Sequence, residues 1–167
     1  MKILSNLPER FRKWDHLFLA MAELISLKSK DPSTKTGCIV VDEDNRIRSS
    51  GFNGFPEGVS DRIQRYEDRE LKYALIAHCD ANAIFSAARS GISLKGCRMY
   101  LTGPPCSECT KGIIQAGIAE VVWPLDNKFE TDAATNERWA ISFGHAGMMA
   151  DEAGVRFRRW EPGHSTV

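Results

Sequence analysis

The sequence predicts an α/β protein of three layers, in which a mixed sheet of about five strands is covered by helices on both faces. Apolar segments of strand length alternate with helical segments along most of the 167 residues. The first two strands are joined by a short turn, which predicts an antiparallel hairpin. Each later strand is separated from the next by a helix, which predicts parallel pairing through right-handed crossovers.

The first half of the chain predicts a helix, a hairpin and a loop. Six apolar residues share helical spacing and predict a helix over roughly 14–29: Trp14, Leu17, Phe18, Met21, Leu24 and Ile25. Pro32 follows this helix and disfavours helical backbone at Asp31. The segments "CIVVD" and "RIRSSGFN" supply the two strands of the hairpin, and "GFNGFPEG" is a Gly/Pro loop.

The second half alternates helices and strands. "DRIQRYEDRELKYALIA" predicts a short helix that leads into His78, and a second helix is expected over about 80–89, with a stop near Gly91. "CRMYLT", "AEVVWP" and "VRFRRWE" are the remaining strands. "PPCSECTKGIIQAG" has prolines before a helix start. "TNERWAISFGHAGMMADEAG" predicts a helix that is weakened by Gly144 and Gly147.

We expect one domain over residues 1–167, with a flexible tail from about residue 161. Hydrophobic residues at 43% and charged residues at 26% are ordinary values for a soluble globular protein. Lys+Arg 22 balances Asp+Glu 22, which disfavours nucleic acid as a partner but allows a basic pocket for one phosphate.

The sequence also predicts where the protein resides. Glu23 interrupts the apolar run "LFLAMAELISL", so we expect neither a signal peptide nor a membrane span. Five cysteines in a chain without a leader suggest reduced thiols and a cytoplasmic location. Cys38 and Cys97 lie in apolar, strand-like segments and are expected in the core.

The segment "PCSEC" places Cys106 and Cys109 three residues apart at a helix start. Both sulfurs then lie on one face of the helix, and its N-terminus favours the thiolate form that binds metal. His78 begins the preceding helix and is expected at the same edge of the sheet, where it can supply a third ligand. Three protein ligands leave a tetrahedral zinc one position for water, which is the arrangement of a catalytic site.

These residues also allow other interpretations. A Cys-x-x-Cys pair can also be a redox pair or two buried thiols, and a single histidine is often structural. Pro105 before the pair, the helix after it and the His-x-Asp segment upstream favour zinc. Cys79 lies about one helical step from His78 and is expected to be packed. His16, His145 and His164 have no partner spacing and are expected to be surface or structural residues.

Asp80 follows His78 by two residues and gives the motif a second role. Zinc nucleobase deaminases combine an H-x-E segment with P-C-x-x-C, and the carboxylate that does not bind zinc moves protons. The chain matches this signature with aspartate in place of glutamate. Zinc would lower the pKa of water toward neutrality, and Asp80 would carry protons to N3 of cytosine and to the leaving amino group.

Longer segments extend this similarity to nearly the whole chain. "SKDPSTKTG", "GFNGFPEG", "HCDANAI", "GPPCSECTKGIIQAGIAEVVW" and "DNKFETDAATNERW…AGVRFRRW" follow one another as in deoxycytidylate (dCMP) deaminases. The chain resembles this family from about Trp14 to Trp160. The resemblance implies the three-layer cytidine-deaminase-like fold, one catalytic Zn²⁺ per chain, and hydrolytic deamination of dCMP to dUMP and ammonia. It also implies a homo-oligomer, often a hexamer, with dCTP and dTTP as effectors.

The resemblance also assigns site residues. By motif match, His78, Cys106 and Cys109 bind zinc, and Asp80 replaces the proton-shuttling glutamate. Asn53 holds the sugar or phosphate of the nucleotide, and Lys128 lies in a loop on the phosphate side. Phe129 stands where related chains often carry tyrosine. Two alternatives stay open: a deaminase for another or a modified cytosine nucleotide, and a zinc-stabilised nucleotide-binding or regulatory protein that the Glu-to-Asp change has impaired.

Overall fold

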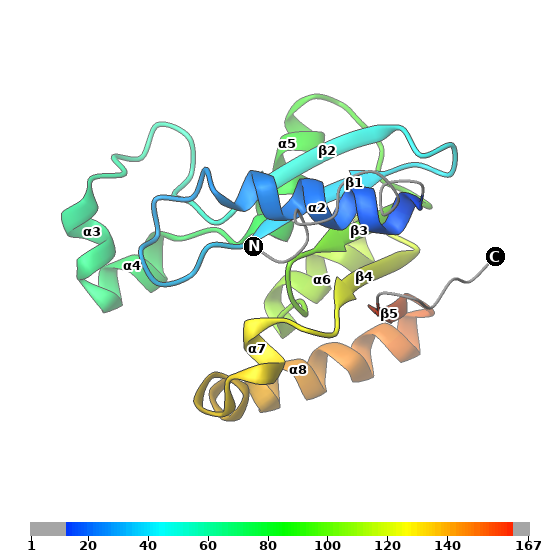
Figure 1. Ribbon diagram of the computed structural model, residues 1–167. Coiled ribbons are helices and arrows are strands. Elements are labelled where there is room, and N and C mark those ends of the chain that lie inside the picture. Colours follow the sequence, from blue (N-terminus) through cyan, green and yellow to red (C-terminus); the bar gives the residue numbers. More distant parts are fainter. Residues whose placement is uncertain (1–12, 162–167) are drawn as a thin grey trace.

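Residues 13–161 are described by a computed structural model, in which a five-stranded sheet lies between helices (Figure 1). The elements are, in chain order, α2 (Trp14–Ser26), β1 (Gly37–Val41), β2 (Ile47–Phe52), α3 (Ile63–Glu67), α4 (Arg69–Leu75), α5 (Cys79–Arg89), β3 (Arg98–Leu101), α6 (Ser107–Gln115), β4 (Glu120–Pro124), α7 (Lys128–Thr131), α8 (Ala133–Ala153) and β5 (Arg156–Trp160).

The sheet confirms the predicted fold class. Its strand order is β2-β1-β3-β4-β5. β1 pairs antiparallel with β2, as the hairpin prediction requires, and also antiparallel with β3. β3, β4 and β5 are parallel to one another, and each is joined to the next through helices. The C-terminal ends of these parallel strands lie at one edge of the sheet, where the loops that lead into α6 and α7 begin.

Each face of the sheet has its own apolar core. β1 is buried along its whole length, and its residues alternate between the faces. Ile39 and Val41 pack with α2, together with Tyr100 of β3. Cys38 and Val40 pack on the opposite face, where side chains of α5, α6 and α8 complete the core. In Figure 1, α2 crosses one face, α5 and α6 lie behind the sheet, and α8 runs along the lower edge.

Two glycines of the hairpin permit very close contact between the sheet and its helices. A Cβ atom at Gly51 of β2 would lie 2.1 Å from the carbonyl oxygen of Cys79 and 2.6 Å from the amide nitrogen of Ala83. A Cβ atom at Gly37 of β1 would lie 1.9 Å from the carbonyl oxygen of Ala22 on the other face. The first turn of α5 therefore rests directly on the backbone of β2.

A network of charged side chains connects the first and last described elements. Arg158 of β5 donates to Asp15 of α2 and to Glu120 of β4, both at 2.8 Å. The hydroxyl of Tyr100 also donates to Asp15, and Arg156 lies 2.7 Å from Glu120. Glu120 is only 4% exposed, so its charge is compensated almost entirely by the two arginines of β5.

The structure differs from the predicted elements in several places. The first helix ends at Ser26 rather than near 29, and the segment before His78 forms two helices, α3 and α4. α7 was not predicted. The expected flexible tail falls mainly at residues 162–167, outside the described residues. Within residues 13–161, no helix is both long enough and apolar enough to cross a membrane.

The predicted last helix is present, and its two glycines do not interrupt it. α8 runs without interruption over 21 residues. Cβ atoms at Gly144 and Gly147 would meet nothing within 4 Å, so these glycines cost only helix propensity, about 1 kcal/mol each. Ala146 and Ala150 are buried against the core and hold the helix in place.

Candidate active site

The three predicted metal ligands come together at the starts of two helices. His78 is the N-cap residue of α5, Cys106 is the N-cap residue of α6, and Cys109 lies in the first turn of α6. The Nδ1 atom of His78 lies 3.5 Å from the sulfur of Cys106 and 3.5 Å from that of Cys109. All three ligand atoms lie within 4.8 Å of one another. The helix–strand–helix arrangement α5–β3–α6 therefore places them as the spacing predicts.

The chemistry of this group fits zinc. One imidazole nitrogen and two sulfurs are the ligands that zinc prefers, and tetrahedral zinc bound by three protein groups keeps a position for water. Cys106 and Cys109 are 7% and 6% exposed, which shields their charge from solvent. No other group of three His, Cys, Asp or Glu side chains with this proximity occurs among residues 13–161.

The protonation of the metal-free group is uneven. A hydrogen bond from Cys109, with support from His78, lowers the pKa of Cys106 to about 4. The pKa of Cys109 is raised because it shares a proton with the Cys106 thiolate. The hydrogen bond to Cys106 also raises the pKa of His78. Metal binding to this group would therefore displace protons from His78 and Cys109, and its zinc affinity would fall at acid pH.

Asp80 lines the same cavity as His78 and Cys106. It is 3% exposed, and one carboxylate oxygen accepts a hydrogen bond of 2.9 Å from the amide of Ala81. Burial raises the pKa of Asp80, while a hydrogen bond from the Cys109 thiol and the charge of His78 act in the opposite direction. A buried carboxyl group with a raised pKa beside a metal site is suited to proton transfer.

The cavity is lined by residues from six parts of the fold. It is bounded by Thr34, Thr36, Asn53, His78, Cys79, Asp80, Leu101, Gly103, Pro104, Cys106, Phe129, Trp139 and Phe143. The polar residues lie on the 31–36 loop and at the start of α5, whereas α7 and α8 supply three aromatic rings. The ring of Phe129 packs on Gly103, where a Cβ atom would lie 2.4 Å away. The cavity therefore has a polar side and a flat aromatic side.

Asn53 joins three segments at the polar side. Its Oδ1 accepts hydrogen bonds from the amide of Cys79, at 2.9 Å, and from the hydroxyl of Thr36. Its Nδ2 donates to the carbonyl oxygen of Thr34 at 3.2 Å. Asn53 is 3% exposed and lines the cavity. It therefore fixes the 31–36 loop against the start of α5, and its predicted contact with the nucleotide stays a prediction.

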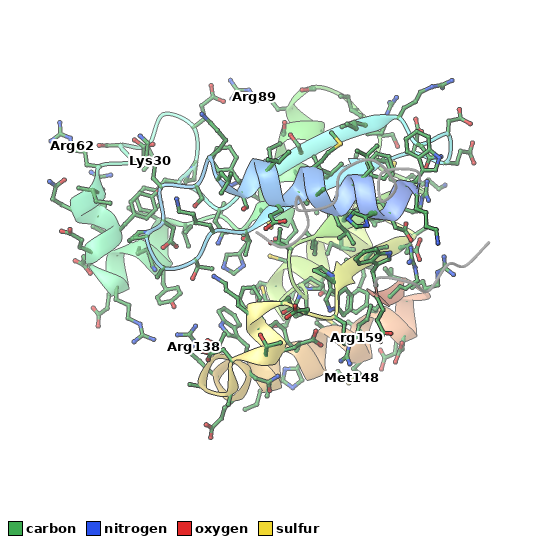
Figure 2. All side chains as sticks on the ribbon, viewed as in Figure 1. Lys30, Arg62, Arg89, Arg138, Met148 and Arg159 are labelled. Carbon is green, nitrogen blue, oxygen red and sulfur yellow. The ribbon has the colours of Figure 1, made fainter. Side chains whose placement is uncertain are left out.

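Lys128 is the first residue of α7 rather than a loop residue. Its Nζ donates to the carbonyl oxygen of Ser33 at 3.3 Å. Burial lowers the pKa of Lys128, and the nearby charges of Arg138 and Lys72 lower it further, against the effect of Asp31. Figure 2 shows Arg138 extending from the first part of α8 toward the side of α3 and α4.

Lys72 is a buried cation that the sequence interpretation missed. Its Nζ donates to Ser33 Oγ at 2.7 Å and to Asp31 Oδ1 at 3.3 Å, and the side chain is 9% exposed. Asp31 also accepts from the amides of Ser33 and Thr34. The 31–36 loop is thus held from α4, α7 and Asn53 together.

The aromatic side of the cavity was also missed. Trp139 lies edge-on to His78, with ring centroids 6.2 Å apart, and it stacks on Phe143. The indole Nε1 of Trp139 is buried and has no hydrogen-bond partner in the part of the chain that the structure describes. Trp139, Phe143, Ala146 and Ala150 lie at helical spacing, a pattern in the sequence from which this face of α8 was predictable.

The remaining cysteines and histidines agree with their predicted roles where the structure describes them. Cys38, Cys79 and Cys97 are buried in the core. His16 is buried and lies edge-on to Trp160, with centroids 5.0 Å apart. His145 is exposed on α8, and His164 lies outside the described residues.

This fold and this site together define a class of protein. An α/β sheet that presents a His/Cys/Cys metal group at helix N-termini, with a buried carboxyl group beside it, is the arrangement of the zinc-dependent nucleobase deaminases.

Comparison with known proteins identifies the family. The family model for the cytidine and deoxycytidylate deaminase zinc-binding region matches residues 12–125. Human deoxycytidylate deaminase is 36% identical over 162 residues, which cover 94% of this chain and 85% of the human protein. An uncharacterised deaminase of Aliivibrio fischeri is 40% identical over 150 residues, covering 90% and 95% of the two chains. The crystal structure of dCMP deaminase from cyanophage S-TIM5 superposes with a TM-score of 0.66 at 26% identity, over 87% of this chain and 96% of that one.

The chain belongs to the cytidine and deoxycytidylate deaminase family.

Proposed function

We propose that this protein hydrolyses dCMP to dUMP and ammonia. The observation that carries this function is the group of His78, Cys106 and Cys109 beside the buried Asp80, which lines one cavity with His78 and Cys106. Relatives named deoxycytidylate deaminase match 94% of the chain, which supports dCMP rather than another cytosine nucleotide as the substrate.

The residues of the chain would divide the chemistry as follows. His78, Cys106 and Cys109 would hold one zinc ion, which when bound supplies an activated water as the nucleophile. Asp80 would accept a proton from that water and donate one to N3 of the cytosine ring. Once the C4–O bond has formed, Asp80 would take the remaining proton of the new C4 hydroxyl and pass it to the amino group, so that the C4–N bond breaks, C4=O forms and ammonia departs. The buried position of Asp80 keeps bulk water from competing for these protons.

The nucleotide would lie between the polar and aromatic sides of the cavity. Phe129, Trp139 and Phe143 offer flat apolar surfaces to the pyrimidine ring and the deoxyribose. Asn53 has a second N–H on Nδ2 that can donate to the sugar or the phosphate. Lys128, with Lys72 nearby, would attract the 5′-phosphate, since their positive charges exceed the single negative charge of Asp31.

We further propose that the chain is one domain, located in the cytoplasm, that assembles as a homo-oligomer, with a hexamer as the first model and dCTP and dTTP as candidate effectors. Exposed apolar side chains support self-association: Phe85 of α5 and Ile141 of α8 are 62% and 75% exposed. A groove of about 550 Å³ lies between these helices and is lined by Tyr73, Ile76 and Phe85 among others. Sedimentation velocity, with and without each effector, tests this proposal.

The decisive experiment is ammonia release by zinc-loaded protein from dCMP, CMP, deoxycytidine and 5-methyl-dCMP. We expect dCMP to be the best substrate. A clear preference for another of these compounds would change the assigned substrate. Binding of dCMP without ammonia release would instead identify a nucleotide-binding protein with an inactive site.

A further inference from the structure

The side chain at the start of α6 faces the metal group and does not cap the helix. Cys106 is the N-cap residue of α6, and its sulfur points to His78. The first N–H groups of a helix have no partner within the helix and need acceptors from elsewhere. Capping side chains normally satisfy the N–H of the second or third helical residue, so the N–H of the first residue, Ser107, needs another acceptor.

Ser142 of α8 supplies that acceptor. The amide of Ser107 donates to Ser142 Oγ at 3.0 Å, and the hydroxyls of the two serines lie 3.1 Å apart. Both residues are partly buried. A side chain from one helix thus caps the first turn of another, 35 residues earlier in the chain.

The same peptide group is also held at its other end. The carbonyl oxygen of Cys106 accepts hydrogen bonds from the amide of Thr110 and from its hydroxyl, both at 2.9 Å. Because a peptide unit is planar, fixing both the C=O of Cys106 and the N–H of Ser107 fixes the orientation of the whole unit. The Cα atom of Cys106 belongs to that unit, so the point from which its side chain reaches the metal group is fixed as well.

We propose that Ser142 is a positioning residue of the metal site. It holds the peptide between Cys106 and Ser107 in the position from which the Cys106 side chain reaches toward His78 and Cys109. Ser142 follows Trp139 by one helical turn, so the same contact ties the aromatic side of the cavity to the ligands. This inference rests on the proposed function, because it requires that the three ligands hold zinc.

Replacement of Ser142 by alanine tests the proposal through metal affinity rather than activity. Loss of a group that orients a ligand typically weakens metal binding by about 10- to 100-fold, and we expect an effect near the lower limit. Competition with a chromophoric chelator measures the zinc dissociation constant. The Co²⁺-substituted protein gives a second readout, since its thiolate charge-transfer bands report the geometry at Cys106.

Two further variants separate positioning from general stability. Ser142→Thr keeps a hydroxyl and should bind zinc as tightly as the wild type. Ser142→Val has nearly the shape of the threonine variant but no hydroxyl, so it should bind zinc as weakly as Ser142→Ala. Asp68→Ala is the matched control, because the Asp68 side chain accepts from the amide of Leu71 at the start of α4. That variant loses a helix cap of the same kind away from the metal group, and it should lower the melting temperature without changing zinc affinity.

The outcomes are distinct. Weaker zinc binding in Ser142→Ala and Ser142→Val, with rescue by Ser142→Thr, supports the proposal. Zinc affinity within twofold of the wild type in both Ser142→Ala and Ser142→Val overturns it. If the wild type itself binds no zinc, the proposed function fails first, and the role of Ser142 fails with it.

Discussion

Gly51→Ala should impair catalysis by displacing the start of α5. The added Cβ atom would lie 2.1 Å from the carbonyl oxygen of Cys79, whereas real contacts of this kind are almost never below 3.0 Å. The first turn of α5 must therefore move by about 1 Å, or β2 must move away by the same amount. His78 and Asp80 lie in this turn, and a misplacement of about 1 Å costs on the order of 10²-fold in rate. We expect kcat/KM for dCMP to fall by about that factor.

Gly37→Ala is the matched control for this variant. Its added Cβ atom would lie 1.9 Å from the carbonyl oxygen of Ala22, on the face of the sheet that carries α2. Overpacking of this kind costs about 1–3 kcal/mol, so both variants should lose similar amounts of stability in thermal unfolding. Only Gly51→Ala should lose most of its activity. Equal activity in the two variants, at equal melting temperature, would refute the reasoning that β2 sets the position of the catalytic residues.

Four further predictions follow from the site and from the ion network. Asp80→Asn should retain zinc by elemental analysis but lose at least about 10²-fold of its ammonia-release rate, since general acid–base catalysis contributes about 10²–10⁴-fold; full activity would exclude Asp80 as the proton carrier. Lys128→Ala should lower kcat/KM for dCMP by about 10- to 100-fold, the value of a charge-assisted hydrogen bond, and should leave deoxycytidine unaffected; equal losses would contradict a phosphate contact. Cys109→Ser should release zinc to a weak chelator and lower the melting temperature at the same time, because metal binding is coupled to folding. Asp15 has a lowered pKa: burial alone would raise it, but hydrogen bonds from Arg158 and Tyr100 outweigh burial. Its stabilising contribution is therefore present above the ordinary carboxyl pKa and is lost as the pH falls through the lowered value. Asp15→Asn should accordingly flatten the loss of unfolding free energy between about pH 5 and pH 2 in urea titrations.

The sequence predicts most of the fold and the metal group for a physical reason. Strands and helices of this chain have strong apolar periodicity, and a Cys-x-x-Cys pair at a helix start fixes its own geometry within one turn. His78 could be added because parallel α/β units bring successive helix N-termini to one edge. These inferences depend on local backbone geometry and on a small number of topological rules.

The polar wall of the cavity was not predictable in the same way, and the helical spacing on α8 indicates a buried face without showing that it lines the cavity. Lys72 is one of three charged residues in "RELKYAL", and nothing in this segment indicates that it is buried. Its burial depends on Asp31, 41 residues earlier. Trp139 lies at core spacing on α8, but Gly144 and Gly147 in the same segment predict a weaker helix and obscure this pattern. The contact of Ser142 with Ser107 requires α8 to pack against α6 so that Ser142 lies beside the first turn of α6. Long-range pairings of single polar groups leave no periodic trace in a sequence.

The ion network between α2 and β5 bears on the order in which the chain is synthesised. Both arginines that compensate Glu120 lie in β5, the last strand, and Arg158 also reaches Asp15 in the first described helix. A nascent chain already contains all three candidate zinc ligands once residue 109 has emerged, yet Glu120 remains without either guanidinium until β5 follows. A product cut short before Arg156 would lack both partners of Glu120 and the strand that pairs with β4. Its metal group would therefore stand on a sheet with an open edge, which is less stable than the finished protein.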